Sequence, residues 1–413
     1  MAVTQPAFGV RLRQLRRERG MSQVELGGEQ FTGSYISHLE SGRREPTPAV
    51  TAFLSERLGV TSFEVFPEEA ASVRDGSSDL ETLEHLLAAE RAWHDQEWRL
   101  ATRNAGRAAA LAAASGNAER AWEARFVLAQ ALLSDGDYGA VSRLAKELID
   151  DQVASRSASL KSQALSLMSV ASRASGHLTD AITWGARAVE ASRETAVMLQ
   201  AEAVMALIGA RSEAGDRGHE LVELCHWLGE LREEVESGYS RGLISWTLGT
   251  AAFQRKDIAR GIHHLEGALE HIKPQRDLRM WARLHKTIAN NRVEAGLDEG
   301  VETSLQLARE GLRLVGNPSD LLELHLVEVK VAYRDGDHAR AESLVRHCLA
   351  EEALHQADHL AGEAERLLGE ICVALDKSKE AKEAFARSAT RFESAGAFGQ
   401  ASASWHLHAQ TSE

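Results

Sequence analysis

Residues 20–26 read GMSQVEL and residues 34–48 read SYISHLESGRREPTP, and these two segments decide the N-terminal fold. Ser22 and Glu25 have the spacing of a capping box, in which a hydroxyl and a carboxylate each accept a backbone N–H at a helix start. The Ser41-Gly42 pair is typical of a helix end. The two segments therefore predict two short helices separated by a turn.

The apolar spacing around these segments extends the helical pattern. Phe8, Leu12 and Leu15 fall on one face of a helix that Gly20 would end. Thr32 is placed to cap the second helix, and Thr47-Pro48 starts another with proline at its first position. Further core residues are expected at Ile36, Leu39, Phe53, Leu54 and Leu58. We predict four or five short helices in residues 1–66.

These motifs resemble the Xre/Cro-type helix-turn-helix family. The resemblance implies a domain over residues 1–66 that inserts the N-terminal side chains of a recognition helix into the major groove of double-stranded operator DNA. Between Leu26 and Tyr35 the turn is one residue shorter than is usual in the family. A four-helix domain that binds protein instead of DNA is the alternative.

The resemblance assigns side chains to the DNA. The candidates for base edges are Thr32, Ser34, Ser37 and His38. By the same resemblance, Gln23 would lie near a phosphate or a base. The candidates for phosphate contacts, which position the protein rather than specify a sequence, are Arg11, Arg13, Arg16, Arg43 and Arg44. Arg11, Arg16 and Arg19 lie off the apolar stripe and are expected to stay solvated.

The charge of the chain is unevenly distributed. Taken whole, the net charge of −14 argues against a nucleic-acid partner. Residues 1–66, however, hold eight Arg and seven Glu, so this segment carries +1 and the remainder carries −15. The asymmetry favours a DNA-binding head joined to an acidic domain.

Residues 67–79 are interpreted as a linker, with Ser78 or Asp79 capping the next helix. After the linker, turn markers recur every 39 to 41 residues. They are Asp95, Gly136, Gly176, Gly215, Lys256, Gly296, Gly336 and Asp376. Two amphipathic helices fit between successive markers, and a small residue often stands five positions after a marker, as at Ala181, Gly261, Ala341 and Ala381. The small residue would let paired helices approach closely.

This pattern resembles tetratricopeptide repeats, whose usual length is about 34 residues. The expected fold is all-α: the small helix-turn-helix domain, then a right-handed superhelical array of about eight antiparallel helix pairs over residues 80–396. Residues 397–413 would form a C-terminal capping helix and tail.

In the tetratricopeptide family, the residues 6, 10 and 13 positions before each turn marker face a concave groove. One cluster in these positions combines positive charge, an amide and an aromatic ring. It comprises Trp246, Thr250, Arg283, Lys286, Asn290, Lys330 and Arg366. Such a set suits a small peptide, its terminal carboxylate, or another small acidic ligand. The alternative is a set of solvated charges paired with Glu294 or Glu328.

Several functional classes find no support in the sequence. It has no apolar run long enough for a membrane span and no signal stretch, so a cytoplasmic protein is expected. Cys225, Cys348 and Cys372 are widely spaced and are interpreted as reduced thiols. No metal-binding spacing, cofactor motif or catalytic constellation occurs, so we expect neither a metal or cofactor nor an enzyme.

Together, the two parts resemble the cytoplasmic peptide-pheromone-sensing regulators of Gram-positive bacteria. The resemblance implies a homodimeric transcriptional regulator in which a peptide on the array sets the geometry of two DNA-reading heads. Two alternatives remain: an array that binds a partner protein, and an interaction scaffold that does not sense a ligand.

Overall fold

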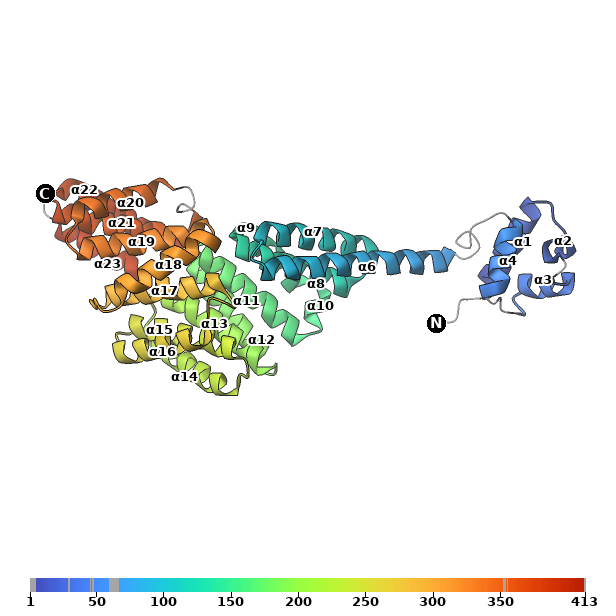
Figure 1. Ribbon diagram of the computed structural model, residues 1–413, viewed down its shortest axis with the longest axis horizontal. Coiled ribbons are helices and arrows are strands. Elements are labelled where there is room, and N and C mark those ends of the chain that lie inside the picture. The colour runs from blue at the N-terminus through green and yellow to red at the C-terminus, as the bar shows by residue number, and fades with distance from the viewer. Residues whose placement is uncertain are drawn as a thin grey trace. The chain divides into compact units, whose positions relative to one another are not determined.

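A computed structural model describes residues 5–28, 30–44, 46, 48–58, 67–351, 354 and 356–411, with backbone alone at 5–7, 48, 49, 51, 52 and 67–78. Over these ranges the chain forms helices and no strand (Figure 1). None of the described helices is long and apolar enough to cross a membrane. The chain divides into two compact units, residues 1–84 with 111–116 and residues 85–110 with 117–413.

The N-terminal unit contains the predicted short helices. They are α1 (Gln5–Glu18), α2 (Gln23–Gly27), α3 (Gly33–Glu40) and α4 (Pro48–Leu58). Their common core is Phe8, Leu12, Leu15, Leu26, Ile36, Leu39, Val50, Leu54 and Leu58. The proposed cap at Thr47 lies outside the described residues. The core holds α3 against α1 and α2.

The structure corrects the expected linker. Residues 67–79 are helical and continue into α6 (Pro67–His94), so no helix begins at Ser78 or Asp79. The physical reason is visible in the sequence. Pro67 is suited to the first helical position, and the acidic residues Glu68 and Glu69 follow in the first turn, where the helix dipole favours negative charge.

The remaining helices form antiparallel pairs of helices that are consecutive in the chain. They are α6 with α7 (Trp98–Ser115), α8 (Ala118–Asp135) with α9 (Tyr138–Asp150), α11 (Ala158–Ala174) with α12 (Leu178–Ser192), α13 (Val197–Glu213) with α14 (His219–Glu234), α15 (Gly238–Gln254) with α16 (Ile258–His271), α17 (Leu278–Glu294) with α18 (Val301–Val315), α19 (Pro318–Arg334) with α20 (His338–Ala350), and α21 (Asp358–Ala374) with α22 (Ser378–Ala395). The short α10 (Gln152–Ser155) follows α9, and α23 (Phe398–Gln410) packs on α22.

The repeat period has a conformational origin. All markers from Gly136 to Asp376 have a positive φ, between 57° and 96°, where the chain turns from the first helix of a pair into the second. In the first pair the left-handed residue is Gln96 rather than Asp95. The following aspartate often caps the second helix: the carboxylates of Asp137, Asp257 and Asp337 each accept a backbone N–H three residues on.

The array also contacts itself between helix pairs that lie four or five pairs apart in the chain. The C-terminal end of α8 meets the start of α19, where Asn317 Nδ2 donates to the Ser134 carbonyl at 3.4 Å. The end of α13 meets α21 and α23: His359 Nε2 lies 2.7 Å from Glu213, and Gln400 Nε2 donates to the Glu213 carbonyl at 2.9 Å. We call these contacts the seam. Leu178, Phe392 and Ala401 add a buried apolar cluster to it.

Candidate nucleic-acid interface and ligand site

The helix α3 presents polar side chains from a rigid position. Thr32 caps it, since its hydroxyl accepts the Tyr35 N–H at 3.2 Å, while Ile36 and Leu39 are buried. On the remaining surface Ser34 and His38 are exposed and Ser37 is half-buried. The preceding helix α2 begins with the predicted capping box: the Ser22 N–H donates to Glu25 at 2.6 Å and the Glu25 N–H to the Ser22 hydroxyl at 3.2 Å.

Arg16 is not solvated as expected. It is 9% exposed, and Nε and Nη2 donate to the two oxygens of Glu40 at 2.5 and 3.0 Å. Gln23 donates to the same carboxylate at 2.9 Å. Burial opposes ionisation of Glu40, but the hydrogen bonds from Arg16 and Gln23 outweigh it and lower the pKa of this carboxyl. Arg16 therefore fixes α1 to the end of α3, because this fork geometry suits a carboxylate.

The other arginines of the head lie nearer the surface. Arg13, Arg43 and Arg44 are exposed, and Arg11 is half-buried. The Arg44 guanidinium lies over the Tyr35 ring, 4.6 Å from its centroid, so it is held beside α3. Arg44 therefore places positive charge beside α3.

In the array, the cations of the predicted ligand cluster are brought together with carboxylates. Lys286 pairs with Glu323, and Arg283 Nε lies 3.1 Å from Asp320. Arg366 binds Glu363 at 2.7 Å and also pairs with Glu370.

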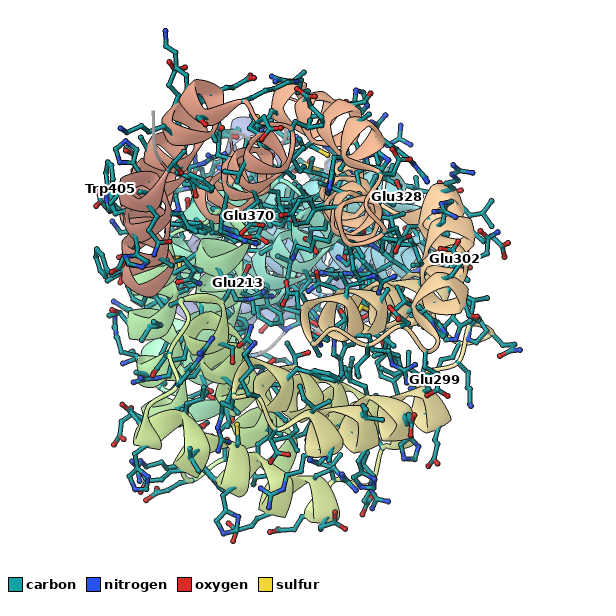
Figure 2. All side chains as sticks on the ribbon, turned by 90° about the vertical axis from the view of Figure 1, so that its left-hand side faces the viewer. Glu213, Glu299, Glu302, Glu328, Glu370 and Trp405 are labelled. Carbon is teal, nitrogen blue, oxygen red and sulfur yellow. The ribbon has the colours of Figure 1, made fainter. Side chains whose placement is uncertain are left out.

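Lys330 links this network across three helix pairs. Its Nζ contacts Glu294 at 2.5 Å, Glu363 at 3.1 Å and the Asn290 amide oxygen at 2.9 Å. The contacts with Asn290 and Glu363 join positions 6 and 13 before successive turn markers, so these positions share one face of the first helices. We call it the inner face. Glu370, at one such position, lies toward the middle of the ring of helices, whereas Glu302 and Trp405 lie at its edge (Figure 2).

The electrostatic consequence is that Asp320 and Glu363 stay ionised. For Asp320, burial raises the pKa, but Arg283 and Arg279 outweigh it and bring the pKa down to about 2. Glu363 behaves alike: Arg366 and Lys330 overcome its burial and lower its pKa. Of the two pairings expected as the alternative to ligand binding, Lys330 with Glu294 occurs, whereas Glu328 binds Arg309 at 2.9 Å instead.

Comparison with known proteins identifies the head. Residues 7–65 match a family described as a helix-turn-helix domain. Over 58 residues the chain is 40% identical to the uncharacterized HTH-type transcriptional regulator y4dJ of Sinorhizobium fredii, covering 14% of this chain and 75% of that protein. The chain belongs to the helix-turn-helix transcriptional regulators.

Solved structures similar to this regulator include two that span nearly its whole length. One is PlcR of Bacillus thuringiensis in complex with the peptide PapR7 and DNA, with 11% identity, a TM-score of 0.29, and coverage of 97% of this chain and 99% of that chain. The other is the Rap conjugation gene regulator of plasmid pLS20 in complex with the Phr* peptide, with 13% identity, a TM-score of 0.46, and coverage of 93% and 99%.

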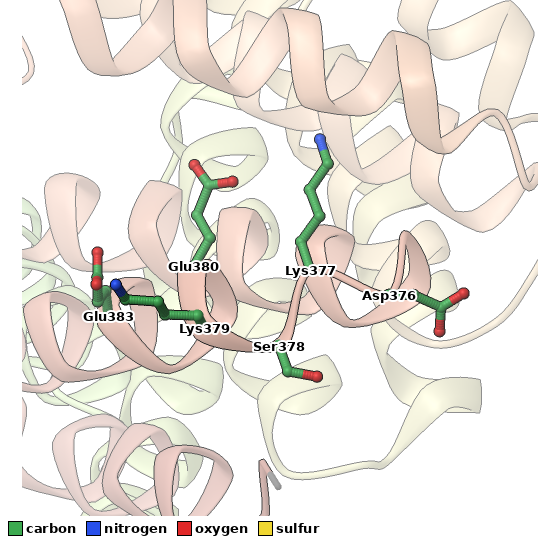
Figure 3. Close-up of a pocket in the computed structure, with 6 residues that line it drawn as sticks. All are labelled: Asp376, Lys377, Ser378, Lys379, Glu380 and Glu383. Atoms are coloured by element: carbon green, nitrogen blue, oxygen red, sulfur yellow. The ribbon is translucent and has the colours of Figure 1, made fainter. Parts of the chain in front are cut away.

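A hollow on the regulator's array surrounds the turn into α22, lined by Lys377, Lys379, Glu380 and Glu383 among others (Figure 3). Nearby, Glu342, Cys372 and Glu380 lie close enough together to share a metal ion. Their carboxylates are already engaged, however, because Lys377 binds Glu342 at 2.6 Å and Arg346 binds both glutamates. The charges here neutralise one another, and we assign this hollow no function.

Sequence reasoning missed two features of the regulator's head. Val24 is 67% exposed and packs beside Gly33 at the start of α3. Arg57, on α4, donates to the Glu25 carbonyl at 2.7 Å. The sequence offered only one indication for Val24, its position directly after Gln23. Its exposure could not be predicted because it depends on how α2 and α3 cross.

Proposed function

We propose that this regulator reads operator DNA through α3 and senses a small peptide on the inner face of its array. The observation that carries the proposal is the arrangement of α3. Its apolar side and the Arg16–Glu40 pair fix the helix in the head, while Ser34 and His38 remain exposed. A helix fixed in the head with exposed polar side chains on its outer surface is suited to major-groove recognition.

In this proposal the side chains divide by task. Thr32, Ser34, Ser37 and His38 face base edges, and Val24 adds an apolar surface suited to a thymine methyl group. Arg11, Arg13, Arg43 and Arg44 hold phosphates, and the second amide atom of Gln23 reaches the backbone or a base. Arg16 leaves the contact set because Glu40 occupies its guanidinium.

The proposed mechanism couples the two parts of the chain. Residues 1–66 form the DNA-binding head and residues 80–396 the sensory array, and two copies form a homodimer that places two heads on two half-sites. The proposed ligand set is Trp246, Thr250, Arg283, Lys286, Asn290, Lys330 and Arg366. A ligand that binds two states of the array with different affinity would change the spacing of the heads.

The test of DNA binding uses the full chain and the DNA upstream of its own gene. Changing Arg43 and Arg44 together to alanine should weaken binding and reduce the salt dependence by about 0.9 for each phosphate that the variant no longer neutralises. The matched control changes Arg156 and Arg193, two arginines of the array with about two-thirds of their side chains exposed. Unchanged affinity and salt dependence in the Arg43/Arg44 variant would overturn the assignment.

A further inference from the structure

The inner face divides into two chemically different parts. On α17, α19 and α21 the charged residues of the proposed ligand set are Arg283, Lys286, Lys330 and Arg366, and each is paired with at least one carboxylate. On α11, α13 and α15 the positions 6, 10 and 13 before the turn marker carry no Lys or Arg, and Arg173, whose side chain lies against Gly209, is bound to Glu213. The second part therefore offers a ligand different chemistry from the first.

The part formed by α11, α13 and α15 contains buried side-chain oxygens that have no hydrogen-bond partner among the described residues. The Ser166 hydroxyl is buried, with the residue 9% exposed, and has no hydrogen-bond partner among the described residues. The same holds for the buried Thr250 Oγ1 and Gln254 Oε1. Buried polar atoms are normally satisfied, so several unsatisfied ones on one face point to a missing partner.

Glu202 adds an unpaired charge to this part of the face. It stands 13 residues before Gly215, the position that Glu323 and Glu363 hold in their own pairs. Those two glutamates are bound to lysine or arginine, whereas Glu202 forms no ion pair or hydrogen bond within the described part of the chain. The residue as a whole is exposed, yet desolvation by the surrounding protein raises the pKa of its carboxyl group. This combination is expected for a group on a concave surface.

A methionine and a tryptophan stand 10 residues before the turn markers Gly215 and Lys256, on the same part of the inner face. Met205 is on the same helix as Glu202, and Trp246 is on α15, which packs against α13. Both side chains are half-buried. A tryptophan face attracts cations, and a methionine adapts its shape to an alkyl chain.

We infer that this part of the inner face binds a positively charged group of a peptide ligand, with the Glu202 carboxylate as its counter-ion. The inference rests on the proposed peptide-sensing function. Trp246 and Met205 cover the alkyl part of a lysine or arginine side chain, while Ser166, Thr250 and Gln254 accept hydrogen bonds from ligand N–H groups. The cations on α17, α19 and α21 are already paired with carboxylates and offer no free positive charge to an acidic ligand. The unpaired Glu202 instead favours a ligand with a positive charge.

The test uses three pools of synthetic heptapeptides that differ only at a fixed central residue, which is lysine, norleucine or glutamate. The other positions are randomised among uncharged residues. Full-length protein is equilibrated with each pool, and the retained peptides are measured by mass spectrometry. We expect preferential retention of the lysine pool. Glu202→Gln should lower that retention about tenfold or more, because a charge-assisted bond is lost.

Two variants keep the result interpretable. Glu302→Gln makes the same change at the outer edge of the array (Figure 2) and should leave retention unchanged. Thr250→Val removes one acceptor without removing a charge and should weaken binding less than Glu202→Gln. Because Glu202 is unpaired and desolvated, Glu202→Gln should melt no lower than the wild type.

Each remaining outcome is decisive. Equal or better retention of the norleucine or glutamate pool would overturn the cationic site and leave peptide sensing intact. Lysine-pool retention that survives Glu202→Gln would overturn the role of this carboxylate. Retention of no pool would overturn both the cationic site and peptide sensing, while DNA binding would be judged separately from the Arg43/Arg44 variant.

Discussion

Arg16 and Glu40 set the position of α3 through one buried ion pair. The Glu40 side chain is 4% exposed, so Glu40→Ala leaves the guanidinium buried without a counter-charge. We expect this to cost about 3 kcal/mol and to speed amide hydrogen exchange in α1 and α3 of the full-length protein. Replacing both residues, as Arg16→Met with Glu40→Leu, should restore most of the protection. Unchanged exchange in the single variant would contradict the role given to this pair.

The buried His285 is expected to make the stability of the fold depend on pH. It is 7% exposed beside Trp281, and burial lowers its pKa from 6.5 to about 4. Between these values the unfolded chain binds the proton more readily, so stability contributed by neutral His285 is present above pH 6.5 and is lost as the pH falls toward 4. The shift corresponds to about 3 kcal/mol.

Denaturant titrations of wild type and His285→Phe at several pH values measure this effect. The difference in unfolding free energy between the two proteins should change over that pH range, whereas His226→Gln, at an exposed position, should follow the wild type. Parallel pH profiles for wild type and His285→Phe would contradict the account.

Sequence reasoning succeeded for residues governed by local rules and failed for those paired through the fold. The capping box at Ser22 and Glu25 depends on neighbours three residues apart, so it could be predicted. Arg16 finds its partner 24 residues away, and Lys330 finds Asn290 40 residues away. No spacing rule connects such residues until the helix packing is known.

At the scale of the helix pair, close approach depends on small residues. A Cβ built on Gly261, in α16, would lie 2.4 Å from the ring of Phe253 in α15. Gly261→Ala should therefore destabilise the protein by about 1–3 kcal/mol through overpacking. Gly267, on the same helix, has nothing within 4 Å of a built Cβ. Gly267→Ala should be neutral or stabilising, because alanine favours the helix.

Thermal or denaturant unfolding of the two alanine variants checks this contrast. The pair is matched, since both variants add one methyl group to α16. Phe253→Leu combined with Gly261→Ala should recover part of the loss. Equal stability of the Gly261 and Gly267 variants would show that this contact does not limit the packing of α15 on α16.

The element scale was the most predictable from sequence. The turn markers adopt left-handed backbone, which glycine favours. Most markers are therefore glycine, and Lys256 and Asp376 adopt the same conformation without it. The predicted start of α6 was wrong. The Gly-Ser-Ser segment at 76–78 suggested a break, but the helix continues through it. Intrinsic propensity is a weak guide to such a position, since context routinely overrides it.

At the scale of the whole array, the seam joins pairs that are distant in sequence. His359 and Arg173 both bind the Glu213 carboxylate, at 2.7 Å each, and overcome its burial so that its pKa falls. His359→Ala should therefore raise amide exchange at both sides of the seam, near residues 213–216 and near 357–361. The control is His347→Ala, an exposed histidine beside Glu351 on α20.

Exchange confined to α21 in the His359 variant would contradict a seam that couples the two regions. An open array would respond only at neighbouring pairs, because each repeat there contacts only the adjacent repeats. The seam could not be predicted from the repeat period, because the number of pairs per superhelical turn depends on small rotations between them.

The most direct test of the regulator as a whole is the selection of bound DNA from a pool of random duplexes by the full-length protein. We expect enrichment of one short motif in two copies related by two-fold symmetry. Their centres should lie about 10 base pairs, or a multiple of that distance, apart, because each copy occupies one face of the helix. Recovery of no motif, or of the same sequences by the Arg43/Arg44 alanine variant, would contradict it.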